Sequence, residues 1–302
     1  MGAADVIAAP LRRDSGAYSL PAMERLFKFH GLGNDFVLLD RRVSGKDITL
    51  AQTQWLCDRH RGIGADGVLV LLPAKSSAAR MVVHNVDGSV PEMCGNGLRC
   101  AVKYLADRTA PQPRTLSVET GAGTLCCALD YAQGEVSSIT VAMGPARLSA
   151  PNLPSGLGGG PFLDVPLTDF GSFPATAVSM GNPHLVLWGA PVARAAEWGP
   201  KLELAPGFPE RTNVEFVEPV DGGLRVVVWE RGVGLTQACG TGACAAVAVG
   251  VSSGRLTAGV ELPVFLPGGA LHVRVRADLG EVHLRGPATF VFEAVVPQGS
   301  GL

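Results

Sequence analysis

Two cysteines occupy equivalent places in two matching stretches of the sequence. Cys94 lies in MCGNGLRCAVKYL, and Cys239 lies in ACGTGACAAVAVG. In both stretches the cysteine is followed by glycine, a small polar residue and a second glycine, and then by a run of residues that favours a helix. The pattern therefore predicts that each cysteine stands at the first turn of a helix.

A thiol at the start of a helix has unusual chemistry. The first backbone N–H groups of a helix have no partner within it and carry a partial positive charge, which favours a nearby anion. Such a position can lower the pKa of cysteine from about 8.5 into the range of roughly 3.5 to 7.5. The glycines of both turns lack Cβ atoms, so a ligand carboxylate can approach the N–H groups closely. Each sulfur is therefore expected to act as a base beside an anion-binding turn.

Two such turns that face each other would hold a sulfur on either side of a bound ligand. One cysteine, as thiolate, removes a proton from a stereogenic carbon, and the other, as thiol, protonates the opposite face. If each sulfur approaches to about 3 to 3.5 Å, the sulfurs lie roughly 7 Å apart. The helix N-termini can also stabilise the anion that forms. The residues predict a two-base racemase or epimerase that needs no cofactor, with Cys94 and Cys239 as its catalytic pair.

The other five cysteines are interpreted as structural, because a cysteine is more often a small buried hydrophobic residue than a catalyst. Seven cysteines are an odd number for a set of disulfides, and none has CxxC spacing. The histidines likewise have no metal-ligand spacing, so no metal is expected. Reduced thiols favour a cytoplasmic protein. The five are Cys57, Cys100, Cys126, Cys127 and Cys244.

Length and composition limit the partners of the chain. The chain has 302 residues, of which 47% are hydrophobic, enough to form two cores. Its net charge is -2, and no basic run indicates a nucleic-acid surface. Its apolar stretches are shorter than the roughly 20 residues that cross a membrane. Residues 1–22 are interpreted as a disordered leader or a mis-called start, because the periodic pattern begins only at Met23.

The resemblance between the two halves extends beyond the cysteines. GNDFVLLD at Gly33 is similar to GNPHLVLW at Gly181, and GPA occurs at both Gly144 and Gly286, in the same order. Two copies are too few for a solenoid, so the repeat predicts two related domains that face one another. We expect an N-terminal domain at 23–145, which the strand at 288–297 completes, and a C-terminal domain at 146–287.

Strand patterns dominate both halves, and the turns between them suit antiparallel hairpins. Helices are expected in DITLAQTQWLCDRH, after a cap at Asp47 or Thr49, and in the two runs after the cysteines. The run after Cys239 is apolar all round, which is typical of a buried helix. The predicted fold class is α+β, with two pseudo-symmetric domains that each wrap a mainly antiparallel sheet around a central helix.

Five motifs resemble those of the diaminopimelate epimerase family. They are FHGLGNDF, NVDGSVPEMCGNGLRC, GNPH, RTNVEF and WERGVGLTQACGTGACA. The resemblance extends from about Met23 to near Pro297. It implies a cofactor-free enzyme that interconverts L,L- and meso-diaminopimelate in lysine and peptidoglycan precursor synthesis, and it suggests a homodimer.

The same resemblance implies roles for individual residues. Cys94 and Cys239 would be the paired base and acid. The turns formed by Gly95 with Asn96 and by Gly240 with Thr241 would hold the carboxylate at the reacting centre. The distal amino acid group would be gripped by Asn34, Asn85, Asn182, Asn213, Glu230 and Arg231.

Two alternative functions remain open from the sequence. One is a two-thiol isomerase that acts like a proline or hydroxyproline racemase, although Asn96 and the neighbouring pair Glu230 and Arg231 favour a longer substrate with two charged ends. The other is a carboxylate-binding relative that keeps the fold without the chemistry.

Overall fold

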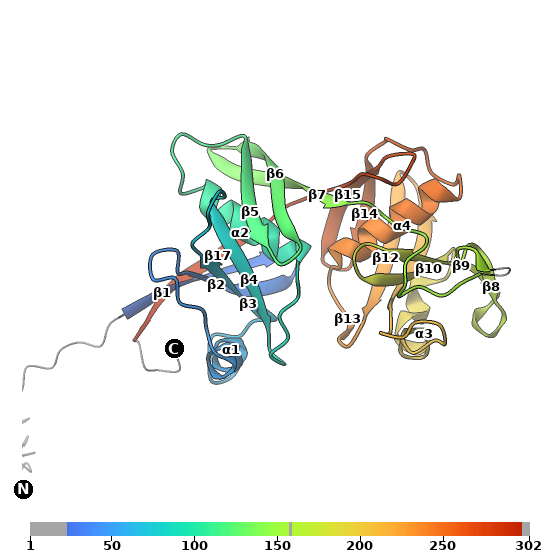
Figure 1. Ribbon diagram of the computed structural model, residues 1–302, viewed down its shortest axis with the longest axis horizontal. Helices are drawn as coiled ribbons and strands as arrows, with labels where there is room; N and C mark the ends of the chain where they lie inside the picture. Colours follow the sequence, from blue (N-terminus) through green and yellow to red (C-terminus); the bar gives the residue numbers. More distant parts are fainter. Residues whose placement is uncertain (1–22, 157–158, 298–302) are drawn as a thin grey trace, which may run out of the picture.

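The computed structural model describes residues 23–156 and 159–297. The interpretation of residues 1–22 concerns a segment outside the described residues. Two lobes lie side by side in Figure 1, with α2 in the first and α4 in the second. Short 3-10 helices occur at η2 (Thr168–Phe170) and η3 (Val192–Arg194).

The elements alternate in a similar order along both parts of the chain. The first part contains β1 (Met23–Gly31), β2 (Asn34–Asp40), α1 (Leu50–Cys57), β3 (Gly67–Leu72), β4 (Ala79–Asn85), α2 (Gly95–Ala106), β5 (Thr115–Thr120), β6 (Gly123–Ala132) and β7 (Glu135–Gly144). The second part contains β8 (Val165–Leu167), β9 (Phe173–Ser179), β10 (Pro183–Trp188), α3 (Ala195–Glu203), β11 (Asn213–Val220), β12 (Gly223–Glu230), β13 (Gly234–Leu235), α4 (Gly240–Ser252), β14 (Leu262–Leu266), β15 (Gly269–Val275), β16 (Val282–Gly286) and finally β17 (Thr289–Pro297).

The strand pairings repeat with the elements. In the first lobe, β1–β2 and β3–β4 are antiparallel, β2–β3 and β4–β5 are parallel, and β5–β6 and β6–β7 are antiparallel. In the second lobe, β9–β10 and β11–β12 are antiparallel, β10–β11 and β12–β14 are parallel, and β14–β15 and β15–β16 are antiparallel. The duplicated sequence thus folds into a duplicated, mainly antiparallel topology.

Two contacts between distant strands connect this duplicated structure. β7 pairs antiparallel with β16, so the two GPA segments end neighbouring strands of different lobes. The last strand, β17, returns to the first lobe and pairs antiparallel with β1, where Met23 lies opposite Pro297. In the second lobe β8 pairs antiparallel with β9, as β17 does with β1 in the first lobe. The domain boundaries at 145 and 287 stay a prediction.

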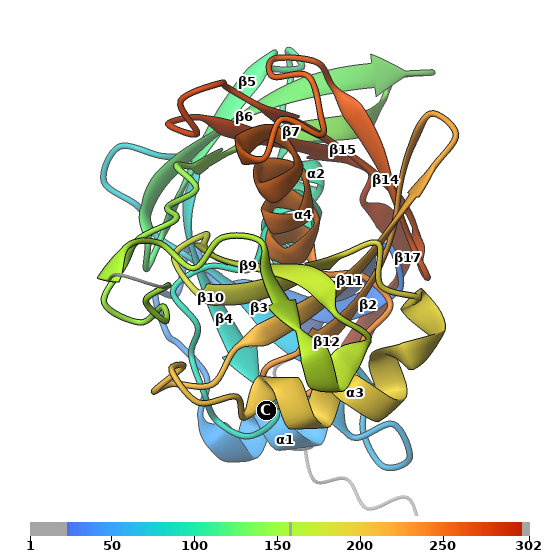
Figure 2. The ribbon, with the colours of Figure 1, turned by 90° about the vertical axis from the view of Figure 1, so that its right-hand side faces the viewer.

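The helices α2 and α4 lie inside the molecule, and strands surround them (Figure 2). Every residue of α2 is buried, as are most residues of α4, and both helices belong to one continuous core. The composition of α4 explains its place, because glycine, alanine and valine leave it no polar face to expose. The predicted fold class, with sheets around central helices, is confirmed.

The helices α1 and α3 lie on the outside of the sheets, over two smaller cores. Thr49 caps α1 and forms a capping box with Gln52, so of the two predicted caps, Asp47 and Thr49, the second is confirmed. The residue pattern does not predict α3, because Gly199 and Pro200 interrupt its helical periodicity. Gly199 is required by packing, since a Cβ there would lie 2.6 Å from the Trp229 ring.

Candidate active site

Both motif cysteines stand at the first turn of a buried helix, as predicted. Cys94 is the N-cap of α2, and its Sγ accepts a hydrogen bond from the backbone N–H of Gly97 at 3.4 Å. Cys239 is the N-cap of α4, and its Sγ accepts from Gly242 N–H at 3.4 Å. The two sulfurs therefore have the same local geometry in different lobes.

The fold brings these two turns together. The Asn96 side chain, in the first turn of α2, donates to the carbonyl of Ala238 at 2.9 Å, directly before Cys239. One methyl carbon of Leu284 lies against both turns, at 3.7 Å from a Cβ built on Gly95 and 3.1 Å from one built on Gly240. The predicted carboxylate turns thus lie at the contact between the lobes.

The predicted low pKa of the two cysteines is wrong in this structure. Burial raises the pKa of the Cys94 thiol, and the N–H of Gly97 offsets only part of that effect. Burial raises the pKa of Cys239 well above its ordinary value, and the carboxylates of Glu230 and Glu215 add to the increase. The cost of placing a charged sulfur in a low-dielectric core exceeds the gain from the helix N-terminus.

Glu230, which is predicted to grip the distal amino acid group, lies beside Cys239. Its carboxylate accepts a hydrogen bond from Thr236 Oγ1 at 2.5 Å, and its charge raises the pKa of both motif cysteines. Burial raises the pKa of Glu230 itself, while Thr236 lowers it. A carboxylate in this position suits an ammonium group close to the reacting carbon.

Asn182 belongs to a buried chain of polar side chains. His184 Nδ1 lies 2.6 Å from Glu215 Oε1, and its Nε2 lies 3.0 Å from Asn182 Oδ1. The side chains of His184 and Glu215 are fully buried. Glu215 Oε1 also lies 2.9 Å from a Cβ built on Gly242, so this chain ends directly beneath the Cys239 turn.

The side-chain amides of Asn34, Asn213 and Asn85 form hydrogen bonds in three separate places. Asn34 donates to Asp66 at 3.1 Å and accepts from Asn96 at 3.1 Å. Asn213 accepts from the backbone N–H of Arg231 at 3.0 Å. The Arg231 guanidinium donates to the carbonyl of Glu210 at 3.1 Å, and Asn85 donates to Ser89 at 2.9 Å.

The sequence motifs do not predict Glu215 or Arg99 as part of the site. Glu215 interrupts the apolar strand β11, and Arg99 lies in the helical run after Cys94. A charged residue at a core position is the sequence feature that could have indicated both. Arg99 is fully buried and donates to Asn96 Oδ1 at 2.8 Å.

The remaining cysteines are mostly buried, as interpreted. Burial raises the pKa of Cys57 to about 11 and that of Cys100, Cys127 and Cys244 to about 12. Cys126 is exposed, because neighbouring residues of β6 point to opposite faces of the sheet. Cys126 therefore differs from the other four structural cysteines in its exposure.

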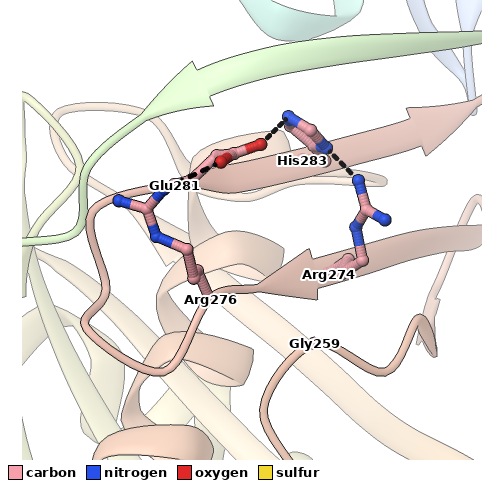
Figure 3. Close-up of a pocket in the computed structure, with 5 residues that line it drawn as sticks. All are labelled: Gly259, Arg274, Arg276, Glu281 and His283. Carbon is pink, nitrogen blue, oxygen red and sulfur yellow. Dashed lines mark hydrogen bonds and ion pairs between the residues drawn. The ribbon is translucent and has the colours of Figure 1, made fainter.

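A pocket of about 250 Å³ lies away from the cysteines, at β15 and β16 (Figure 3). Arg276 and His283 both bind the carboxylate of Glu281, at 3.1 and 2.9 Å, and Arg274 donates to His283 at 2.7 Å. Gly259 completes its lining. Because most of its charged groups bind one another, it differs from the anion-binding site that the cysteine motifs predict.

Within residues 23–156 and 159–297, no group of three or more His, Cys, Asp or Glu side chains is placed to hold a metal ion. No helix in the same ranges has the length and apolar character needed to cross a membrane.

The fold is that of a class of two-lobed epimerases and related isomerases. A hydroxyproline epimerase from Agrobacterium vitis superimposes with a TM-score of 0.65 at 18% identity, covering 91% of each chain. A structure described as a predicted epimerase from Pseudomonas aeruginosa gives a TM-score of 0.68 at 17% identity, covering 90% of this chain and 98% of that one. These likenesses establish the fold.

The sequence establishes the family. Residues 26–149 and 176–291 match the diaminopimelate epimerase family, and the chain belongs to it. A diaminopimelate epimerase from Desulforudis audaxviator is 46% identical over 272 residues, which cover 88% of this chain and 96% of that protein. One from Synechococcus elongatus is 44% identical over 273 residues, with 88% and 95% covered. The family resemblance predicted from the motifs is confirmed.

Proposed function

We propose that this protein epimerises L,L-diaminopimelate to meso-diaminopimelate, in lysine and peptidoglycan precursor synthesis, with Cys94 and Cys239 as the acid and base. The observation that carries the proposal is the contact between two cysteine-capped helix N-termini from different lobes. The relatives named diaminopimelate epimerase support the substrate. A purified enzyme that forms the meso isomer without an added cofactor is the expected result.

In this mechanism the substrate carboxylate binds the N–H groups of two turns, Gly95 with Asn96 and Gly240 with Thr241. One sulfur removes the α-proton and the other returns a proton to the opposite face. Burial opposes the thiolate in the free protein. The substrate ammonium carries a positive charge next to the sulfurs, which offsets that cost and favours the thiolate when substrate is bound.

The remaining predicted contacts would distinguish the two ends of the substrate. The Arg231 guanidinium suits the distal carboxylate, because its planar fork binds carboxylates in a bidentate way. Asn213 supports this role by fixing the Arg231 backbone at 3.0 Å. Glu230 suits an ammonium group, and the amides of Asn34, Asn85 and Asn182 supply further polar contacts.

Solvent deuterium exchange tests the proposal against both alternatives. The enzyme is expected to incorporate deuterium into diaminopimelate and not into proline or hydroxyproline. Exchange into proline alone would favour the racemase-like alternative. Exchange into none of these amino acids, together with carboxylate binding in a thermal-shift assay, would favour the non-catalytic alternative.

We also propose that the enzyme is a cytoplasmic homodimer that associates through β17. This strand exposes Phe290, Val291, Phe292 and Val295, each at least 40% accessible, and exposed apolar strands favour self-association. Light scattering is expected to give a dimer for the wild type and a monomer for Phe292→Asp. Val43→Asp, which changes an exposed residue in a different segment, is the control and is expected to stay dimeric. A monomeric wild type would contradict the dimer.

A further inference from the structure

Arg99 is a buried cation in the middle of the core. Its side chain is 0% exposed, and among the described residues it forms no ion pair with a carboxylate. Its guanidinium donates to three uncharged oxygens: Gly95 O at 3.2 Å, Asn96 Oδ1 at 2.8 Å and Pro287 O at 3.0 Å. An unpaired charge in a core lowers stability. Its position therefore requires an explanation beyond packing.

The surrounding backbone leaves space for this guanidinium. A Cβ built on Gly31, at the end of β1, would lie 3.0 Å from Arg99 Nη2. A Cβ built on Gly286, at the end of β16, would lie 3.4 Å from Arg99 Nε. Glycines on strands from both lobes thus border the same side chain. Arg99 lies where the chain crosses from β16 back to β17.

Arg99 determines which way the Asn96 amide faces. A guanidinium has donors only, so it holds the carbonyl oxygen of the Asn96 side chain toward itself. The Asn96 NH2 group must then point away, and it donates to Ala238 O at 2.9 Å and to Asn34 Oδ1 at 3.1 Å. Ala238 directly precedes Cys239. One hydrogen-bonded chain thus joins Arg99 to the second cysteine turn.

Among the described residues of the second lobe there is no corresponding link. The positions equivalent to Asn96 and Arg99 are Thr241 and Cys244. Thr241 Oγ1 lies 3.5 Å from the sulfur of Cys239, within its own turn, and Cys244 is a buried thiol. The contact that ties the two turns together therefore comes from the α2 side.

We propose that Arg99 is a positioning residue that sets the place of Cys239 relative to Cys94, acting through Asn96. The inference rests on the proposed epimerase function. Inversion needs both sulfurs, because the proton is removed from one face and delivered to the other. Exchange without inversion needs only one sulfur, which removes and returns a proton on the same face. Loss of the link therefore impairs inversion more than exchange. A misplacement of about 1 Å costs on the order of 100-fold in rate.

The test compares Arg99→Met with Lys103→Met in the full-length enzyme. Lys103 is a matched control, because it is also a buried cation of α2 but binds Val136 O and Asp107, away from both cysteines. Each stereoisomer is incubated in D2O, and mass spectrometry and chiral chromatography measure inverted product and deuterium in the unconverted substrate. Thermal unfolding monitored by circular dichroism checks the fold.

For Arg99→Met we expect inversion to fall about 100-fold and the ratio of exchange to inversion to rise about tenfold or more, for at least one stereoisomer. Lys103→Met is expected to keep the wild-type ratio. If Arg99→Met does not fold, Arg99→Lys decides, because lysine keeps the charge but lacks the fork that binds three oxygens. An unchanged ratio in the folded Arg99 variant overturns the inference. A wild type that makes no meso product overturns the proposed function instead.

Discussion

The helices α2 and α4 occupy equivalent places but have different compositions. Both begin at a cysteine and lie in the core. In α4 nearly every residue is small and apolar, whereas α2 buries Arg99 and Lys103, which bind backbone oxygens and Asp107. The core thus holds both a helix without charged residues and one whose charged side chains are hydrogen-bonded.

This difference gives the two sulfurs different surroundings. Burial raises the pKa of both thiols, and the charge of Glu230 adds to the increase at each. At Cys94 the N–H of Gly97 and the positive charge of Arg99 lower the pKa, whereas at Cys239 a second carboxylate, Glu215, raises it further. An acid/base pair benefits from two groups whose environments separate their pKa values. The duplicated fold therefore makes the two cysteine turns alike, and the different charged residues around the two sulfurs make their pKa values differ.

The largest expected effect comes from removing either sulfur. Cys94→Ala and Cys239→Ala are each expected to lower the epimerisation rate by about 10²–10⁴-fold or more, because each removes one member of the acid/base pair. Chiral chromatography of the product measures the loss. Near-normal turnover in either folded variant would show that the lobes do not share the chemistry.

The pH dependence of the free enzyme gives the next effect. Since burial raises the pKa of both thiols, the thiolate is the minor form near neutral pH. The value of kcat/KM is therefore expected to rise about tenfold per pH unit from neutral into the alkaline range, until the first thiol titrates. A plateau that begins below neutral pH would mean that a cysteine is already ionised in the free enzyme.

The polar chain beneath the second turn predicts a loss of stability. Glu215→Leu leaves Nδ1 of the fully buried His184 ring without its partner, which costs about 1–3 kcal/mol in the free energy of unfolding. Glu215→Gln keeps a polar group beside the ring and is expected to cost less. Urea denaturation measures both variants, and equal losses would indicate that packing alone matters at this position.

The smallest expected effect separates two equivalent glycines. A Cβ at Gly242 would lie 2.9 Å from both Glu215 Oε1 and Val228 Cγ2, whereas a Cβ at Gly97 would lie 2.8 Å from the end of the flexible Leu69 side chain. Gly242→Ala is therefore expected to be less stable than Gly97→Ala by about 1 kcal/mol. The midpoints of thermal unfolding provide the comparison, and the opposite order would contradict it.

Local patterns predicted much of this structure. Residue types and spacing within short stretches predict the cysteine turns, the Thr49 cap, the buried α4 and the repeat. These features depend only on residues that are close together in the sequence. The pKa of the cysteines depends on how deeply the finished fold buries them. The links from Arg99 to Pro287 and from Asn96 to Ala238 join residues far apart in the chain. No periodicity in a short segment indicates such contacts.

The return of β17 to β1 also affects how the protein is made. During synthesis on the ribosome, β1 emerges early, but the strand that pairs with it is translated after the whole second lobe. Until then the nascent chain exposes one edge of its first sheet, which is a site for wrong pairing. The first lobe therefore gains its full set of strand partners only after the second lobe has been translated.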